Sequence, residues 1–159
     1  MRMRLGAWCL LLGGALAAAP VLAQLEPEYE EEEEEEALFA ILTAELTPEA
    51  VPETGGTAGA SGKFRGELDS DTGDVCYTLE VRGLRDVGEA HIHRGDPGRD
   101  GSDVIDLEVT GRDGDICIAR QPRDINGILG DVAGHYIDVH LRSNRRTVAI
   151  RGQLVKVEE

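Results

Sequence analysis

Apolar residues recur at every second position over residues 75–82 of this sequence. Val75, Tyr77, Leu79 and Val81 fall on one side of an extended backbone, and the residues between them fall on the other. This period of two is typical of a β-strand with one buried face and does not suit a helix.

Seven more short segments have this character, and turn residues such as Asp113-Gly114 separate them. They cover residues 38–42, 63–68, 90–93, 104–109, 116–118, 136–141 and 147–154. Only residues 124–132 have helical spacing, with Asp124 as the candidate N-cap. We therefore predict an all-β fold, an antiparallel sandwich or barrel of about eight strands with one short helix near 124–132. The pattern lacks the alternation of strands and helices that a doubly wound nucleotide-binding fold requires.

The first 23 residues have the features of a secretory signal peptide. Arg2 and Arg4 precede an apolar stretch over residues 5–19, which Pro20 ends. Small or apolar residues then lead to Ala23, after which we expect cleavage. The apolar stretch is shorter than the roughly 20 residues of a membrane span, and a retained N-terminal anchor is the alternative. We thus predict an exported protein, periplasmic, at the cell surface or extracellular, without stable membrane insertion after cleavage.

Residues 24–37 form an acidic segment with seven consecutive glutamates at positions 30–36. Like charges at this density repel and cannot be buried, so we predict a disordered tether ahead of a domain over residues 38–159. The whole chain has a formal net charge of −15. This charge argues against nucleic acid and anionic membrane surfaces as partners, because both are bound through clustered Lys and Arg.

Removal of the signal peptide would remove Cys9 and leave Cys76 and Cys117, which allow one intramolecular disulfide. Both are out of phase with the apolar residues of their segments, so they would share one face of neighbouring strands. An exported protein can form this bond, and two free buried thiols are the alternative.

Several stretches, taken in their order along the chain, resemble the CHRD domain, a family named after chordin and common in exported bacterial proteins. They are Gly73-Asp74-Val75-Cys76-Tyr77, Ala90-His91-Ile92-His93-Arg94-Gly95, Tyr136-Ile137-Asp138-Val139-His140 and Ile150-Arg151-Gly152-Gln153-Leu154. The resemblance covers Leu38 to about Val155. It implies a Greek-key-like β-sandwich of immunoglobulin or superoxide-dismutase type, a single Cys76–Cys117 pair as in bacterial members, and no general enzymatic activity.

Three departures from the family pattern lie close to His140. The family usually has Asn where this chain has Asp138, and Thr where it has Leu141. The following hairpin typically holds Pro and Gly, where this chain has Ser143-Asn144-Arg145-Arg146. These changes bear on any polar function shared through this strand and not on the fold.

The histidines are the candidate functional residues. His91 and His93 are two apart on a predicted strand, so both side chains should project from the same face. With His140 from another strand, they could form a mononuclear site for Zn²⁺ or copper. His135 has the opposite parity to His140, so one of these two should face away.

Two other interpretations of the histidines remain open at this point. In the first, they are structural: one ring nitrogen donates to a backbone carbonyl, and the other accepts from Arg151, Gln153 or a loop amide. In the second, they transfer protons in catalysis. Nucleophilic catalysis has little support, since no serine lies in a Gly-x-Ser-x-Gly turn.

We therefore expect an exported, non-catalytic CHRD module with a binding or structural role and no cofactor. Its ligand would be an unknown protein, glycan or matrix component, and no residue is predicted to be catalytic. The alternative is a mononuclear Zn- or Cu-binding protein. The residues that carry the family motifs are His91, His93, His140, Arg151, Gly152 and Gln153.

Overall fold

The structure is a computed structural model that describes residues 38–52 and 55–158. The predicted signal peptide and acidic tether lie outside these residues. The described elements, in chain order, are β1 (Phe39–Leu46), β2 (Ser61–Asp69), β3 (Asp74–Arg82), β4 (Val87–Arg94), β5 (Ser102–Leu107), β6 (Ile116–Ala119), α1 (Pro122–Gly130), the 3₁₀ turn η1 (Val132–Gly134), β7 (His135–Leu141), β8 (Asn144–Gln153) and β9 (Val155–Lys156). Within the described ranges, no helix is long and apolar enough to cross a bilayer.

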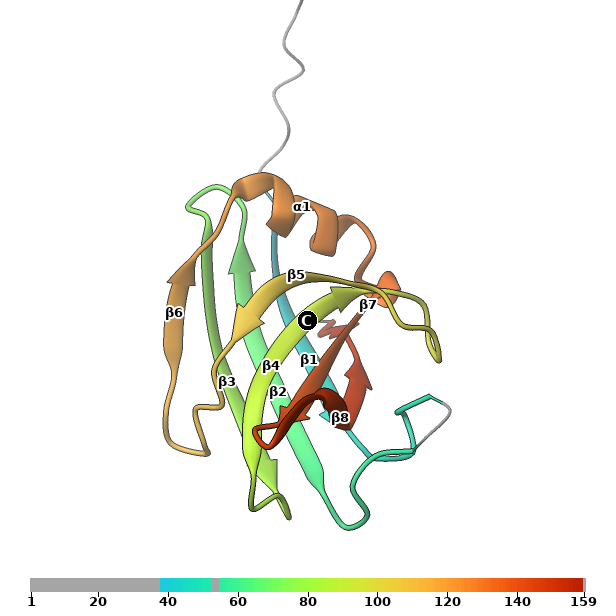
Figure 1. Ribbon diagram of the computed structural model, residues 1–159. Helices are drawn as coiled ribbons and strands as arrows, with labels where there is room; N and C mark the ends of the chain where they lie inside the picture. The colour runs from blue at the N-terminus through green and yellow to red at the C-terminus, as the bar shows by residue number, and fades with distance from the viewer. Residues whose placement is uncertain (1–37, 53–54, 159) are drawn as a thin grey trace, which may run out of the picture. The chain divides into compact units, whose positions relative to one another are not determined.

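The strands form two antiparallel sheets (Figure 1). One sheet has the order β6-β3-β2-β1-β9 and the other β5-β4-β7-β8. The chain crosses between them repeatedly: β6 returns beside β3 only after β4 and β5 have joined the second sheet. The predicted all-β sandwich with Greek-key-like connections is confirmed, with the two-residue strand β9 as an addition to the eight predicted segments.

The core lies between the two sheets and follows directly from the alternation in the sequence. Along β2 and the first part of β3, every second side chain is buried. The buried apolar residues from the two sheets form one cluster, which includes Leu42, Leu46, Phe64, Leu68, Val75, Leu79, Ile92, Ile105, Ile137, Val139 and Ile150. Because successive strand residues point to opposite faces, the residues between these positions are placed on the outer faces of the sandwich.

The helix begins two residues before the predicted segment. Its N-cap is Gln121 and not Asp124, and Pro122 occupies the first turn. Proline is well suited to that position, because its missing N–H would have no partner within the helix. Asp124 instead lies in the first turn, while Ile125 and Ile128 are fully buried and join the core.

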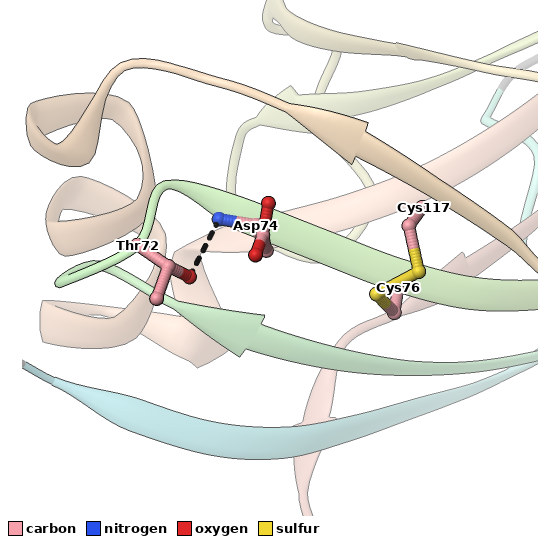
Figure 2. Close-up of a disulfide and its surroundings, with 4 residues drawn as sticks. All are labelled: Thr72, Asp74, Cys76 and Cys117. Atoms are coloured by element: carbon pink, nitrogen blue, oxygen red, sulfur yellow. Dashed lines mark hydrogen bonds between the residues drawn. A yellow bond between two sulfur atoms is a disulfide. The ribbon is translucent and has the colours of Figure 1, made fainter.

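The predicted disulfide between Cys76 and Cys117 is present (Figure 2). The two cysteines are directly opposite each other in the register of β3 and β6. Their neighbours Val75 and Tyr77 are buried in the core, so the bond lies on the outer face of the sheet. It fastens β6, an edge strand of four residues, to the rest of its sheet.

Candidate functional site

The outer face of the four-stranded sheet carries a cluster of histidines around one aspartate. On β4, Ala90 and Ile92 belong to the core, so His91 and His93 project from the opposite face. The predicted common orientation of these two histidines is confirmed by a ring-to-ring distance of 5.5 Å.

The neighbouring strand β7 supplies the other members of the cluster. Ile137 and Val139 enter the core, which turns Asp138 and His140 to the outer face. Asp138 pairs with His91 across the two strands. The His140 ring lies 5.2 Å from the ring of His91, so the three predicted histidines are brought together.

Asp138 lies at the centre of this cluster. Its Oδ1 atom is 2.9 Å from Nε2 of His93 and 3.1 Å from Nε2 of His140. Nδ1 of His91 is 3.8 Å from the same oxygen, which is too far for a hydrogen bond. Three imidazole nitrogens therefore face one carboxylate oxygen on a side chain that is only 2% exposed.

The other carboxylate oxygen of Asp138 faces Arg151 of β8, at 3.6 Å from Nη2. The guanidinium lies over the ring of Tyr136, 4.1 Å from its centre. It also donates to the backbone oxygen of Arg99 at 3.2 Å and to Oδ1 of Asp100 at 2.8 Å. Arg151 thus connects the buried carboxylate to the loop that follows β4.

The outer side of His93 contacts Gly101, at the end of the same loop, and Asp103 at the start of β5. Its Nδ1 lies 3.0 Å from Oδ1 of Asp103 and 3.4 Å from the backbone oxygen of Gly101. Its ring stacks on Tyr136 at 4.9 Å, and the Tyr136 hydroxyl accepts from the Gly101 amide at 3.0 Å. Both ring nitrogens of His93 therefore face oxygen atoms.

These contacts shift the pKa values of two groups in opposite directions. Burial raises the pKa of Asp138, but hydrogen bonds from His140 and His93 and their charges outweigh it and hold the pKa well below its ordinary value. Burial lowers the pKa of His93, but the hydrogen bond to Asp138 and the charges of Asp138 and Asp103 outweigh it and raise the pKa.

Two buried nitrogen atoms of the cluster have no hydrogen-bond partner, Nδ1 of His91 and Nδ1 of His140. A hydrogen-bond network was one expected interpretation of the histidines, and His93 fits it through Gly101. Arg151 makes its contacts to Asp138 and to the loop after β4. The network thus leaves the inward-facing nitrogen of His91 without a partner.

The remaining motif residues and His135 have structural contacts. The Gln153 amide donates to the backbone oxygens of Gly95, Ala133 and His135, at 3.2, 2.6 and 2.8 Å. His135 faces away from the cluster, as its parity predicts, and is hydrogen-bonded through Nδ1 to the Asp131 backbone oxygen at 2.7 Å. Gly152 lies against β1, where a Cβ atom would clash with the Glu45 carbonyl oxygen.

Asp138 is the member of the cluster that sequence reasoning missed. In the sequence it stands out only as a departure from the family's usual Asn. Its position two residues before His140 already placed it on the same face of the strand, and that parity was the signal available in the sequence.

A cavity of about 490 Å³ adjoins Arg151, the residue that contacts Asp138 of the cluster. Two of the motif residues of β8, Arg151 and Gln153, contribute to its lining. The rest of the lining comes from Glu49, Ala50 and Pro52 after β1 and from Pro97 and Gly98 in the loop after β4.

Comparison with known protein families gives a match to the CHRD domain over residues 42–154. Comparisons with curated protein sequences and with solved structures give no match. The matched range runs from β1 to the end of β8 and contains every residue of the cluster. The resemblance noted in the sequence is thereby confirmed, and this chain belongs to the CHRD domain family.

Proposed function

We propose that this protein is an exported, non-catalytic CHRD module that binds an uncharged glycan in the cavity beside Arg151 and Gln153. The observation that carries this proposal is that two residues of the family motif line the cavity. Membership in the CHRD family supports a module without enzymatic activity. The disulfide is consistent with export, because such bonds persist in oxidising compartments.

The chemistry of the lining suits a sugar. Pro52, Pro97 and Ala50 offer small apolar surfaces for the C–H face of a pyranose ring. The carboxylate of Glu49 and the amide of Gln153 offer polar groups for its hydroxyls. The strongly negative chain disfavours an anionic ligand, which is why we propose an uncharged one.

A defined glycan panel tests this proposal with two matched variants. Ala50→Trp places a large side chain at the cavity, whereas Ala58→Trp places the same side chain at an exposed position that is not in the lining. We expect the native protein and Ala58→Trp to bind the same glycan, and Ala50→Trp to bind it at least about tenfold more weakly, a loss of roughly 1.4 kcal/mol. Equal binding by both variants would disprove the site. Binding to immobilised matrix proteins and to no glycan would replace the proposed ligand class.

A further inference from the structure

We propose that His91, His93, Asp138 and His140 form a mononuclear binding site for a divalent transition-metal ion, with Zn²⁺ and Cu²⁺ as the candidates. One ligand atom from each of these four side chains lies within 4.8 Å of all the others. Two strands, β4 and β7, supply the whole set, and the pairing of His91 with Asp138 fixes their spacing.

The distances around Asp138 Oδ1 suit a shared ion. Zinc is bound at about 2.0–2.1 Å by imidazole and carboxylate, so tetrahedral ligands lie roughly 3.4 Å apart. The three nitrogens are 2.9, 3.1 and 3.8 Å from this oxygen, which brackets that value. All four ligand atoms lie within 4.8 Å of one another, and rotation of the imidazole side chains would bring the more distant ones closer together.

A second feature that points to a bound ion is the unpartnered Nδ1 of His91. This atom is buried, has no hydrogen-bond partner and lies 3.8 Å from the central oxygen. An unsatisfied buried polar atom is energetically unfavourable. A cation between His91 and Asp138 would give this nitrogen a partner without any change in the backbone.

The type of ligand atoms selects the class of ion. Three imidazole nitrogens and one carboxylate oxygen suit Zn²⁺ and Cu²⁺. Mg²⁺ and Ca²⁺ prefer sites made of oxygen atoms, and this set has only one carboxylate.

Neighbouring residues that do not bind the proposed ion themselves orient two of its ligands, His93 and Asp138. Asp103 and the Gly101 carbonyl face Nδ1 of His93, which directs Nε2 of that ring toward the proposed ion. Arg151 lies 3.6 Å from Oδ2 of Asp138, so Oδ1, the other carboxylate oxygen, faces the histidines. The carboxylate of Asp100 lies 2.8 Å from the Arg151 guanidinium and balances its charge. The guanidinium therefore repels the proposed ion less strongly.

An ion can reach this site from solvent. The side chains of His91 and His140 are 14% and 12% exposed, and the carboxylate of Asp106 lies 3.8 Å from the outward-facing Nε2 of His91. Asp106 is 85% exposed and adds negative charge at the rim, which attracts a cation.

Calorimetric titration of the chelator-treated protein with Zn²⁺ and with Cu²⁺ tests the proposal. We expect one ion per chain for at least one of these metals. His91→Ala and His140→Ala should each weaken its binding by about 100-fold or more, since losses of outer partners alone reach 10–100-fold. His135→Gln is the matched control: it removes the fourth histidine of the domain, which faces away from the cluster, and should leave affinity unchanged.

Two features of this experiment separate binding at the proposed site from other effects. The glutamates at positions 30–36 are present in every variant, so weak cation binding to them cancels in the comparison. Co²⁺ titration of the unmodified protein needs no variant: a tetrahedral site of three nitrogens and one oxygen gives intense visible absorption that a hydrated ion lacks. No uptake of either metal by the folded protein, or equal uptake by the native protein and His91→Ala, would overturn the proposal. Glycan binding is a separate measurement, so failure of one proposal leaves the other standing.

Discussion

At the scale of single residues, Asp138 is the side chain that connects the polar groups of the outer face. One buried carboxylate faces two imidazoles at hydrogen-bond distance, a third imidazole and the guanidinium of Arg151. Removing it would take away the buried carboxylate that these groups share and leave only the exposed carboxylates of Asp100 and Asp103 beside Arg151 and His93. Breaking a buried charge pair by removing one partner is strongly destabilising.

Substitution Asp138→Ala should therefore lower the free energy of unfolding by about 3–5 kcal/mol. Urea denaturation at neutral pH with a chelator present measures this. Asp106→Ala is the matched control, because that carboxylate also lies near His91 but is 85% exposed, and it should change stability by no more than about 0.5 kcal/mol. Similar losses for the two variants would contradict the central role of Asp138.

The same carboxylate predicts how stability depends on pH. The pKa of Asp138 is lowered in the folded protein, so its stabilisation is present above its unfolded pKa near 3.9 and is lost as the pH falls. The pKa of His93 is raised, so its stabilisation is present below about 6.5 and is lost as the pH rises through the folded pKa. The extra stability of the native protein over Asp138→Asn should be greatest between about pH 4 and 6.5. A difference that does not vary with pH in metal-free unfolding series would refute this assignment.

At the scale of elements, β8 explains why Gly152 belongs to the family motif. This strand lies in the sheet that carries the histidines, yet Thr47, just beyond β1, forms a bridge with Arg151. The two sheets approach so closely here that the Glu45 backbone occupies the space of a side chain at position 152. A glycine is needed because of this contact and not because of its backbone angles.

The substitution Gly152→Ala should consequently be strongly destabilising, by several kcal/mol, since the obstructing atoms are backbone and cannot rotate away. The same substitution at Gly130 is the control. A Cβ there meets nothing within 4 Å, and at this last residue of α1 alanine should leave the stability unchanged or raise it slightly. Thermal unfolding should show a clearly lower melting temperature for Gly152→Ala only, and a tolerated Gly152→Ala would refute the argument.

The disulfide joins the edge strand β6 of the five-stranded sheet to β3. It closes a loop of 41 residues between β3 and β6, for which chain entropy predicts a stabilisation of about 4 kcal/mol. The double substitution of Cys76 and Cys117 by alanine should lower the free energy of unfolding by roughly this amount. Thiol titration of the unfolded native protein without reductant should find neither cysteine free, and two reactive thiols there would exclude the bond.

At the scale of the whole molecule, the fold was largely predictable and the site only in part. All eight predicted strand segments are strands. An alternating pattern places the apolar side chains on one face of a strand, and that face must be buried. The bounds of α1 were less accurate, since Pro122 at the start of a helix also fits a turn. The two-residue strand β9 has no periodicity long enough to detect.

The site shows the same limit more clearly. Parity placed His91 and His93 together, but only the register between β4 and β7 reveals that Asp138 lies among them. Register depends on pairing between distant segments, which no local pattern contains. Sequence reasoning thus brought together His91, His93 and His140 but did not place Asp138 between them.

The predicted export signal concerns the whole chain and has its own test. Mass spectrometry of the protein recovered from the exported fraction should show a chain beginning at Gln24, after cleavage following Ala23. A chain that retains residues 1–23 and stays with the membrane would instead support an uncleaved anchor.

The histidine cluster projects from the opposite side of the strands whose other side chains build the core. The side chains of the proposed metal site and those of the core therefore occupy separate alternating positions of the same backbone. Replacing the four side chains of the proposed metal site by others of similar size alters none of the interior apolar packing. If the proposed site binds an ion, the domain can host redesigned coordination chemistry in which the histidine positions carry new donors while Asp138, which also stabilises the fold, is kept.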